Sequence, residues 1–236
     1  MEYIEVARAE TERGELVLRE RREEGSPTSL ELRANGVFVM DSQETSTEQA
    51  LADAALELVE DPRDVLVGGL GLGYTMHRVL ADSRVERCTV VEIEHALVEW
   101  MRDGTVPHGP GLLADERTNL VIADITAAVG EGAAGSYDLV LLDVDNGPGY
   151  LVHDRNSAIY QAPFVTEVRR LLRPGGAVVI WSADPSPDLE TTQRAVFGNA
   201  ETRAYDVRLQ ERDEKYWLHV ARLDRGQGPA QENAER

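Results

Sequence analysis

Val65-Leu66-Val67-Gly68-Gly69-Leu70-Gly71-Leu72-Gly73-Tyr74-Thr75 is the stretch that decides the fold of this chain. It opens with a short, wholly apolar strand and ends where the pattern of a helix begins. Glycine lets the backbone between them turn sharply and approach a ligand closely, and the following helix offers free N–H groups at its start. The position of this loop predicts a nucleoside site, with Gly69, Gly71 and Gly73 around the ligand.

Strands and helices alternate on both sides of this stretch. The expected strands are 65–68, 88–93, 119–122, 138–142 and 176–181, and the expected helices are 47–60, 74–82, 95–101, 163–172 and 188–197. Strands that are apolar on both faces and separated by helices predict a parallel sheet covered on both sides. Two alternating runs, 202–209 and 215–223, predict a closing hairpin through 210–214. We therefore expect an α/β protein with a Rossmann-like class I methyltransferase fold.

Both ends of the chain differ from this pattern. Short alternating runs at 15–20, 29–33 and 37–40, separated by turn residues, predict a small antiparallel β-hairpin unit over residues 1–46. Such a unit is too small to be stable alone, so it should pack on the Rossmann-like domain, 47–223. Residues 224–236 have almost no apolar side chains and predict a disordered tail.

Composition narrows the classes of partner and compartment. The formal net charge of -19 disfavours nucleic acid and anionic membrane as partners, because like charges repel. The start of the chain lacks a signal-peptide pattern and no stretch is apolar for long enough to span a bilayer. Cys88 is the only cysteine, which fits a reducing compartment. We expect a cytoplasmic protein.

Acidic residues follow the second and third strands, where a nucleoside would lie. Glu92, followed by Ile93, comes about 20 residues after the glycines, a place where a carboxylate binds ribose hydroxyls. The same spacing allows a dinucleotide such as NAD, or a solvated acid. Asp124, followed by Ile125, is placed to contact an adenine amino group, or simply to cap the next helix.

The most apolar strand leads into two further acids, Asp143 and Asp145. A partly desolvated carboxylate there suits holding or deprotonating an amine or hydroxyl acceptor, although an Asx-type turn is the alternative. The long connection that follows is a candidate substrate wall, with Asn146, His153 and Tyr160 as acceptor contacts. No histidine pair has metal-ligand spacing, so we predict no metal.

The order of these motifs resembles the spermidine synthase family, the polyamine aminopropyltransferases. The resemblance runs from about Glu15 to about Asp184, and its motifs are Val39-Met40-Asp41, residues 65–75, Val91-Glu92-Ile93-Glu94, Asp124, Asp143, Gly147-Pro148, Tyr160 and residues 172–176. It implies decarboxylated S-adenosylmethionine as donor, a polyamine as product, and a homodimer formed through the N-terminal β-unit.

Three departures bear on the reaction. Leu72 stands where the family has an acid for the donor's amino group, and Asn146 stands where it has the second catalytic acid, unless Asp145 substitutes. The stretch 48–55 lacks the family's Tyr-His. We therefore expect an S-adenosylmethionine-dependent transferase that methylates a small-molecule acceptor, with Asp143 orienting or deprotonating it. The alternatives are a true aminopropyltransferase and a non-catalytic nucleoside-binding module.

Overall fold

A computed structural model describes residues 1–149, 151, 153–209 and 212–226. Its larger sheet has seven strands in the order β10-β11-β9-β8-β5-β6-β7. The strands are β5 (Asp64–Gly68), β6 (Arg87–Glu92), β7 (Thr118–Ile122), β8 (Tyr137–Leu142), β9 (Leu172–Ser182), β10 (Glu201–Leu209) and β11 (Arg212–Arg222). The first five are parallel, and β11 runs antiparallel to both β9 and β10. The predicted fold class is confirmed.

Successive residues of the central strands enter two different cores. Val65 and Val67 of β5 pack with one apolar cluster, whereas Leu66 between them packs with the other. The same alternation continues along β8 and β9. Both faces of the sheet are thus covered, which explains why these strands read as continuous apolar runs.

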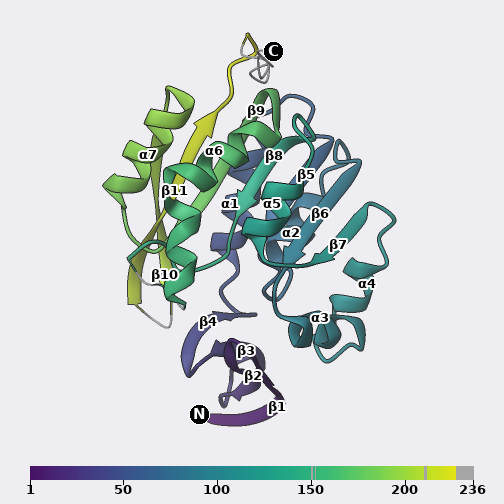
Figure 1. The fold of residues 1–236 in the computed structure, drawn as a ribbon. Helices are drawn as coiled ribbons and strands as arrows, with labels where there is room; N and C mark the ends of the chain where they lie inside the picture. Colours follow the sequence, from purple (N-terminus) through teal and green to yellow (C-terminus); the bar gives the residue numbers. More distant parts are fainter. Residues whose placement is uncertain (150, 152, 210–211, 227–236) are drawn as a thin grey trace.

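Helices form the two outer layers (Figure 1). One core receives α1 (Ser46–Leu56), α2 (Tyr74–Leu80), α3 (His95–Arg102) and α4 (Gly109–Leu113); the other receives α5 (Ile125–Glu131), the 3-10 helix η1 (Asp154–Tyr160), α6 (Ala162–Leu171) and α7 (Pro187–Phe197). The predicted helix 47–60 ends early, at Leu56, and α4 was not predicted. The strand predicted at 176–181 begins four residues sooner, directly after α6.

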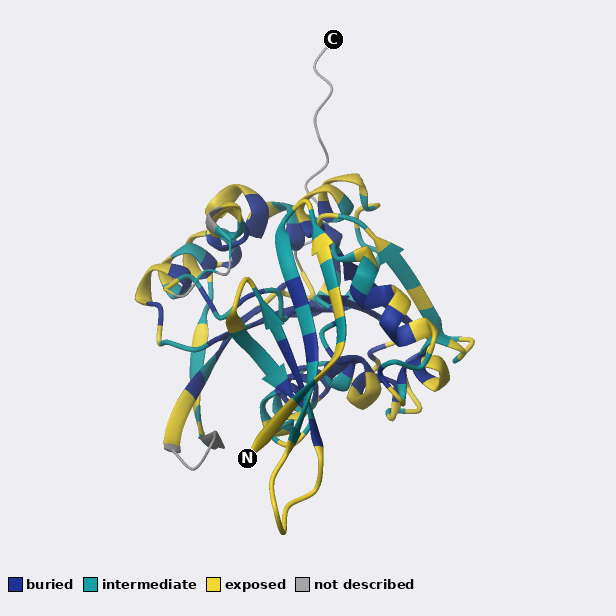
Figure 2. Cartoon of the chain, turned by 90° about the horizontal axis from the view of Figure 1, so that it is seen from below, coloured by how far each residue is buried: buried dark blue, intermediate teal, exposed yellow. Residues whose placement is uncertain are grey.

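The N-terminal unit is a four-stranded antiparallel sheet in the order β1-β2-β3-β4. Its strands are β1 (Glu2–Thr11), β2 (Gly14–Arg22), β3 (Ser29–Ala34) and β4 (Val37–Asp41). β1 was missed because it is an edge strand with mostly exposed side chains (Figure 2). Leu16, Leu18 and Leu32 are buried and join the first core, so this unit packs on the main domain as expected.

Two expectations concern the C-terminal part of the chain. β11 begins at Arg212, so most of the predicted turn 210–214 belongs to the strand, while residues 210–211 lie outside the described residues. The predicted disordered tail falls largely on 227–236, which also lie outside them. Within the described part, no helix is long and apolar enough to cross a membrane.

Candidate active site

A cavity of about 390 Å³ lies at the carboxyl ends of the parallel strands. The loops after β5, β6, β8 and β9 form one side of it, and the N-terminal sheet together with the start of α1 forms the other. Eight of the predicted site residues line this cavity: Gly69, Gly71, Glu92, Ile93, Asp143, Asp145, Asn146 and His153. The switch point between β5 and β8, where the chain reverses its direction of winding, is the usual ligand site in such sheets.

The glycine loop is fixed to its neighbours by backbone contacts. Gly69 has φ +92°, and a Cβ added there would lie 2.1 Å from the carbonyl oxygen of Asp143. Its N–H donates to the carbonyl of Val91 (2.9 Å), and the N–H of Leu70 donates to Glu92 Oε2 (2.9 Å). The loops after β5, β6 and β8 therefore approach each other as closely as backbone allows, and only glycine fits at position 69.

Glu92 is buried, and each of its carboxylate oxygens accepts a backbone N–H. Oε2 accepts from Leu70 and Oε1 accepts from Glu94 (2.7 Å). Burial raises the pKa of Glu92, and these backbone hydrogen bonds oppose the rise. Because each oxygen keeps a second lone pair, the carboxylate still has acceptor capacity toward ribose hydroxyls in the cavity.

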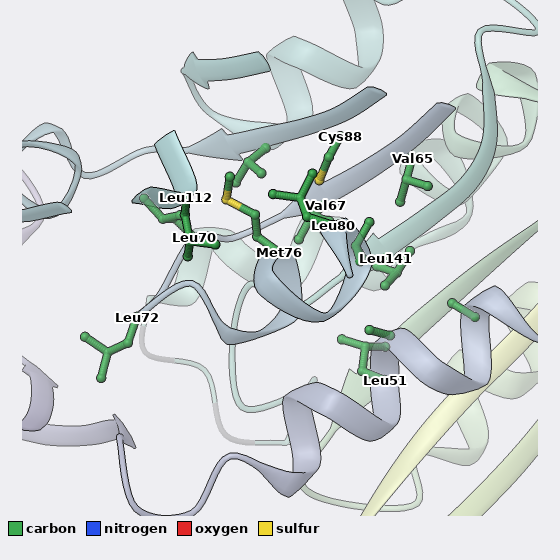
Figure 3. Packing of buried hydrophobic residues seen from close by; sticks show 14 of the residues in the cluster. Leu51, Val65, Val67, Leu70, Leu72, Met76, Leu80, Cys88, Leu112 and Leu141 are labelled. Atoms are coloured by element: carbon green, nitrogen blue, oxygen red, sulfur yellow. The ribbon is translucent and has the colours of Figure 1, made fainter. Parts of the chain in front are cut away.

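Leu72 shows how the glycine loop departs from the family pattern. Its side chain is fully buried and belongs to the first core, at the edge nearest the glycine loop (Figure 3). Its N–H contacts the sulfur of Met40 on β4 at 3.1 Å, and its carbonyl accepts from His108 Nε2 at 2.6 Å. The loop is thus held by Met40 and His108, which the sequence analysis did not place at the site, and position 72 offers no carboxylate.

Four predicted site residues do not line the cavity. Gly73 is the N-cap of α2, with φ +86°, and a Cβ added there would lie 2.9 Å from Met101 Cε. Asp124 accepts from the Thr126 N–H (2.7 Å) and caps α5, and Ile125 belongs to the second core. The capping alternative for Asp124 is therefore present, and an adenine contact stays a prediction.

Tyr160 is the fourth of them. Its ring packs in the second core, and burial strongly raises the pKa of its hydroxyl. It does not line the cavity, and a contact between Tyr160 and an acceptor stays a prediction.

The two predicted catalytic acids both line the cavity. Asp143 Oδ2 accepts from the Thr75 hydroxyl (2.9 Å), and burial raises the pKa of Asp143 to about 6. Asp145 is also buried, and its Oδ2 accepts from the side-chain amide of Asn156 (2.7 Å). Thr75 and Asn156, the two hydrogen-bond donors named here, are uncharged side chains.

Glu48, on the first turn of α1, is a third acid that sequence reasoning missed. It is 8% exposed, lines the cavity, and accepts from the Thr47 hydroxyl (2.6 Å). Desolvation, and after it the negative charge of Asp143, raises the pKa of Glu48 to about 7. Two carboxyl groups that repel each other in a partly dry cavity form a site that favours a cation between them.

Aromatic rings complete the wall next to these acids. Trp181, Tyr216 and Tyr74 line the cavity, and the Trp181 and Tyr216 rings are stacked with centroids 6.3 Å apart. Aromatic faces attract alkylammonium groups. Within the described residues, no group of three or more His, Cys, Asp and Glu is arranged to hold a metal ion.

We expect Glu48→Gln to stabilise the ligand-free protein at high pH. Its pKa lies near 7 in the fold against an ordinary 4.5, so the folded state binds this proton more tightly. The protonated Glu48 side chain makes its whole contribution to stability below pH 4.5, and this contribution is lost as the pH rises through 7. Gln mimics the protonated form, so the free energy of unfolding should rise by about 2–3 kcal/mol at pH 8. Denaturant unfolding of wild type and Glu48→Gln at pH 4.5 and at pH 8 measures this difference.

The matched control for this experiment is Glu57→Gln. Glu57 is exposed at the C-terminal end of the same helix. The Glu57 variant should follow the wild-type pH profile. Parallel profiles for wild type and Glu48→Gln would contradict the prediction.

Fold and site together define a class I methyltransferase-like α/β protein with an acid-lined cavity at its switch point. The model of the spermine/spermidine synthase domain matches residues 33–201. This match covers more than half of the chain, and the chain belongs to the spermine/spermidine synthase family.

Relatives with curated names agree with this family. The polyamine aminopropyltransferase 2 of Pseudomonas aeruginosa is 32% identical over 168 residues, which are 66% of this chain and 46% of that protein. The polyamine aminopropyltransferase 2 of Hyperthermus butylicus is 32% identical over 163 residues, 67% of this chain and 50% of that protein. This chain therefore spans about half the length of the curated relatives it matches.

Solved structures show the same fold at lower identity. A spermidine synthase in complex with the transition-state analogue AdoDATO has a TM-score of 0.77 at 19% identity, covering 96% of this chain and 75% of that one. The spermidine synthase from Thermotoga maritima has a TM-score of 0.76 at 18% identity, with the same coverage. The comparisons favour the aminopropyl alternative over methyl transfer, which none of them supports.

Proposed function

We propose that this protein is an aminopropyltransferase that transfers the aminopropyl group of decarboxylated S-adenosylmethionine to a small amine. The observation that carries the proposal is the charge of the cavity. Its acidic lining residues are Glu15, Asp41, Glu44, Glu48, Glu92, Glu94, Asp143, Asp145 and Glu214, and its permanently cationic ones are Arg13 and Lys215. A cavity so rich in carboxylates favours a cationic ligand over a neutral or anionic one.

The arrangement of the acids supports two functional halves. Gly69, Gly71 and Glu92 fit a nucleoside, because a close backbone approach and a ribose-binding carboxylate lie on one cavity wall. Asp143 and Asp145 form the other half, beside the aromatic wall. This half suits an alkylamine, whose ammonium groups are held by carboxylates and whose methylenes pack on rings.

The proposed reaction is a displacement at carbon. The nitrogen of an uncharged acceptor amine forms a bond to the aminopropyl carbon, the carbon–sulfur bond breaks, and 5′-methylthioadenosine leaves with the electron pair on sulfur. The surplus proton on nitrogen goes to Asp143, whose pKa of about 6 suits a base near neutral pH. Alignment of the two ligands supplies the rest of the rate enhancement.

Leu72 adds a condition to the proposal. The donor's amino group needs a carboxylate, and the glycine loop offers none. Glu48 and Glu44 are the cavity acids available on α1 and in the segment leading into it. We therefore assign the donor's ammonium group to this pair of glutamates, with Asp143 and Asp145 left for the acceptor.

Thermal unfolding with each donor tests the proposal first. Decarboxylated S-adenosylmethionine should raise the midpoint, and intact S-adenosylmethionine should raise it less, because its extra carboxylate enters an acidic cavity. Incubation with 1,4-diaminobutane should then yield 5′-methylthioadenosine and an aminopropylated amine, detected by mass spectrometry. Stabilisation by the intact donor alone, or a methylated product, would overturn the proposal in favour of methyl transfer.

A further inference from the structure

Arg13, in the turn between β1 and β2, reaches across the cavity to two loops of the main domain. Its Nε lies 3.4 Å from Oε1 of Glu94, which lies two residues after the ribose-side acid Glu92. Its Nη2 donates to Asn156 Oδ1 (3.2 Å), and the amide nitrogen of Asn156 donates to Asp145 Oδ2 (2.7 Å). One side chain of the N-terminal sheet thus contacts both halves of the site.

The chemistry of the three groups allows only one orientation of the Asn156 amide. A guanidinium only donates hydrogen bonds, and an ionised carboxylate only accepts them. Asn156 must therefore turn its oxygen to Arg13 and its nitrogen to Asp145. Without the guanidinium, the amide loses the described contact that holds its oxygen, so it can flip and turn that oxygen toward the carboxylate.

We call the chain of contacts from Arg13 through Asn156 to Asp145 the relay. Burial strengthens its contacts. The Arg13 side chain is 22% exposed and that of Glu94 is 15% exposed, so neither is fully screened by water. Asp145 is buried, and its other oxygen accepts the Asn146 N–H (2.8 Å). Asn35 supports the turn from behind: its amide donates to the Arg13 carbonyl (3.1 Å), and its oxygen accepts from the Glu15 N–H (3.0 Å).

We propose that Arg13 is a positioning residue that sets the orientation of Asp145 through Asn156, so that the N-terminal sheet completes the acceptor half of the active site. This rests on the proposed function for the identity of the acceptor, a small diamine. Arg13 touches neither reacting group; it fixes where the Asp145 carboxylate points, and its pairing with Glu94 keeps its own charge from repelling the amine.

The experiment compares Arg13→Gln, Asn156→Ala and the double variant with wild type. Each single change should raise the KM for 1,4-diaminobutane about tenfold, the usual effect of losing one hydrogen bond to a charged group. The KM for decarboxylated S-adenosylmethionine should change by less than about threefold, a split that a merely structural role would not produce. The double variant should be no worse than either single one, because both changes break the same relay.

Arg22→Gln is the matched control. Arg22 ends β2, is exposed, and pairs with Glu20 away from the cavity lining. It should leave all kinetic constants unchanged. Effects of Arg13→Gln and Asn156→Ala that multiply, or equal changes in both KM values, would overturn the proposal.

A second measurement does not depend on the reaction. In wild type, the side-chain N–H protons of Asn156 should be protected from exchange with water in NMR spectra, and Arg13→Gln should speed that exchange about tenfold. If wild type neither binds nor converts the diamine, the proposed function fails, while this exchange rate still decides whether Arg13 orients Asn156. Unchanged exchange in Arg13→Gln would overturn the relay itself.

Discussion

Asp143→Asn is expected to lower kcat by about 10³-fold, within the range for losing a general base. Asn can still accept the Thr75 hydrogen bond through its amide oxygen, so the local geometry should persist. It cannot take the proton from the acceptor amine, and it carries no charge to attract an ammonium group. The affinity for the donor, measured by calorimetry, should change by less than about threefold.

Stability separates this effect from damage to the fold. Burial raises the pKa of Asp143 to about 6. Below the ordinary value of 3.8 the side chain is protonated and costs no stability, whereas above pH 6 it is ionised and its burial lowers the free energy of unfolding. Asp143→Asn should therefore be as stable as wild type at pH 4 and more stable at pH 8. A lost kcat together with a gained free energy of unfolding would place the defect in the chemistry.

Asp138 provides the contrast on the same strand. Near the opposite end of β8, its Oδ2 accepts from Arg173 Nη1 (2.8 Å) and from the Asp64 N–H (2.8 Å). Asp138→Asn should lower the free energy of unfolding by about 1–3 kcal/mol and leave kcat unchanged. Retention of more than a tenth of wild-type kcat by Asp143→Asn would remove Asp143 from the catalytic role.

The parallel sheet was predictable because each of its central strands is a continuous apolar run that can be recognised from its own residues. Val65–Gly68 and residues 138–142 are apolar on both faces, and the sheet does bury both faces. β1 has no such pattern, because its side chains alternate weakly and are mostly exposed. Its strand conformation depends on antiparallel pairing with β2. A strand that depends on a partner for its stability leaves little trace in its own sequence.

The site was predictable where its residues directly follow strands, because the carboxyl ends of parallel strands converge. Glu92, Asp143 and Asp145 were found in this way. Arg13 was not, since it reaches the cavity from the turn between β1 and β2, whose placement depends on packing of the N-terminal sheet. Its role needs the tertiary structure.

Glu48 did leave a signal. It lies three, four and seven positions before Leu51, Ala52 and Ala55, which are all buried, so an acid occupies the apolar stripe of α1. A charged residue is almost never fully buried unless it is paired, so an acid on such a stripe is a candidate site residue.

Gly69→Ala is expected to have the largest effect on stability, a loss of about 3 kcal/mol or more, together with loss of donor binding. The φ of +92° disfavours any L-residue, and the new Cβ would lie 2.1 Å from the Asp143 carbonyl oxygen. That oxygen is a backbone atom of the residue that directly follows β8, so the strain cannot be relieved by a side-chain rotation. Relief requires the loops after β5 and β8 to separate, which moves Leu70 away from Glu92 and displaces Asp143.

Gly130→Ala distinguishes this cause from a general cost of replacing glycine. Gly130 lies within α5, and no atom lies within 4 Å of its added Cβ. Alanine there should raise the free energy of unfolding by about 0.5–1 kcal/mol, because it favours the helix. If the contact between Gly69 and Asp143 holds the two halves of the site together, denaturant unfolding should show changes of opposite sign in the free energy of unfolding of the two variants. Donor titration should show lost binding for Gly69→Ala alone. Wild-type donor affinity in Gly69→Ala would mean that the glycine loop does not form the donor half, and Glu92 would then have to bind the ribose without it.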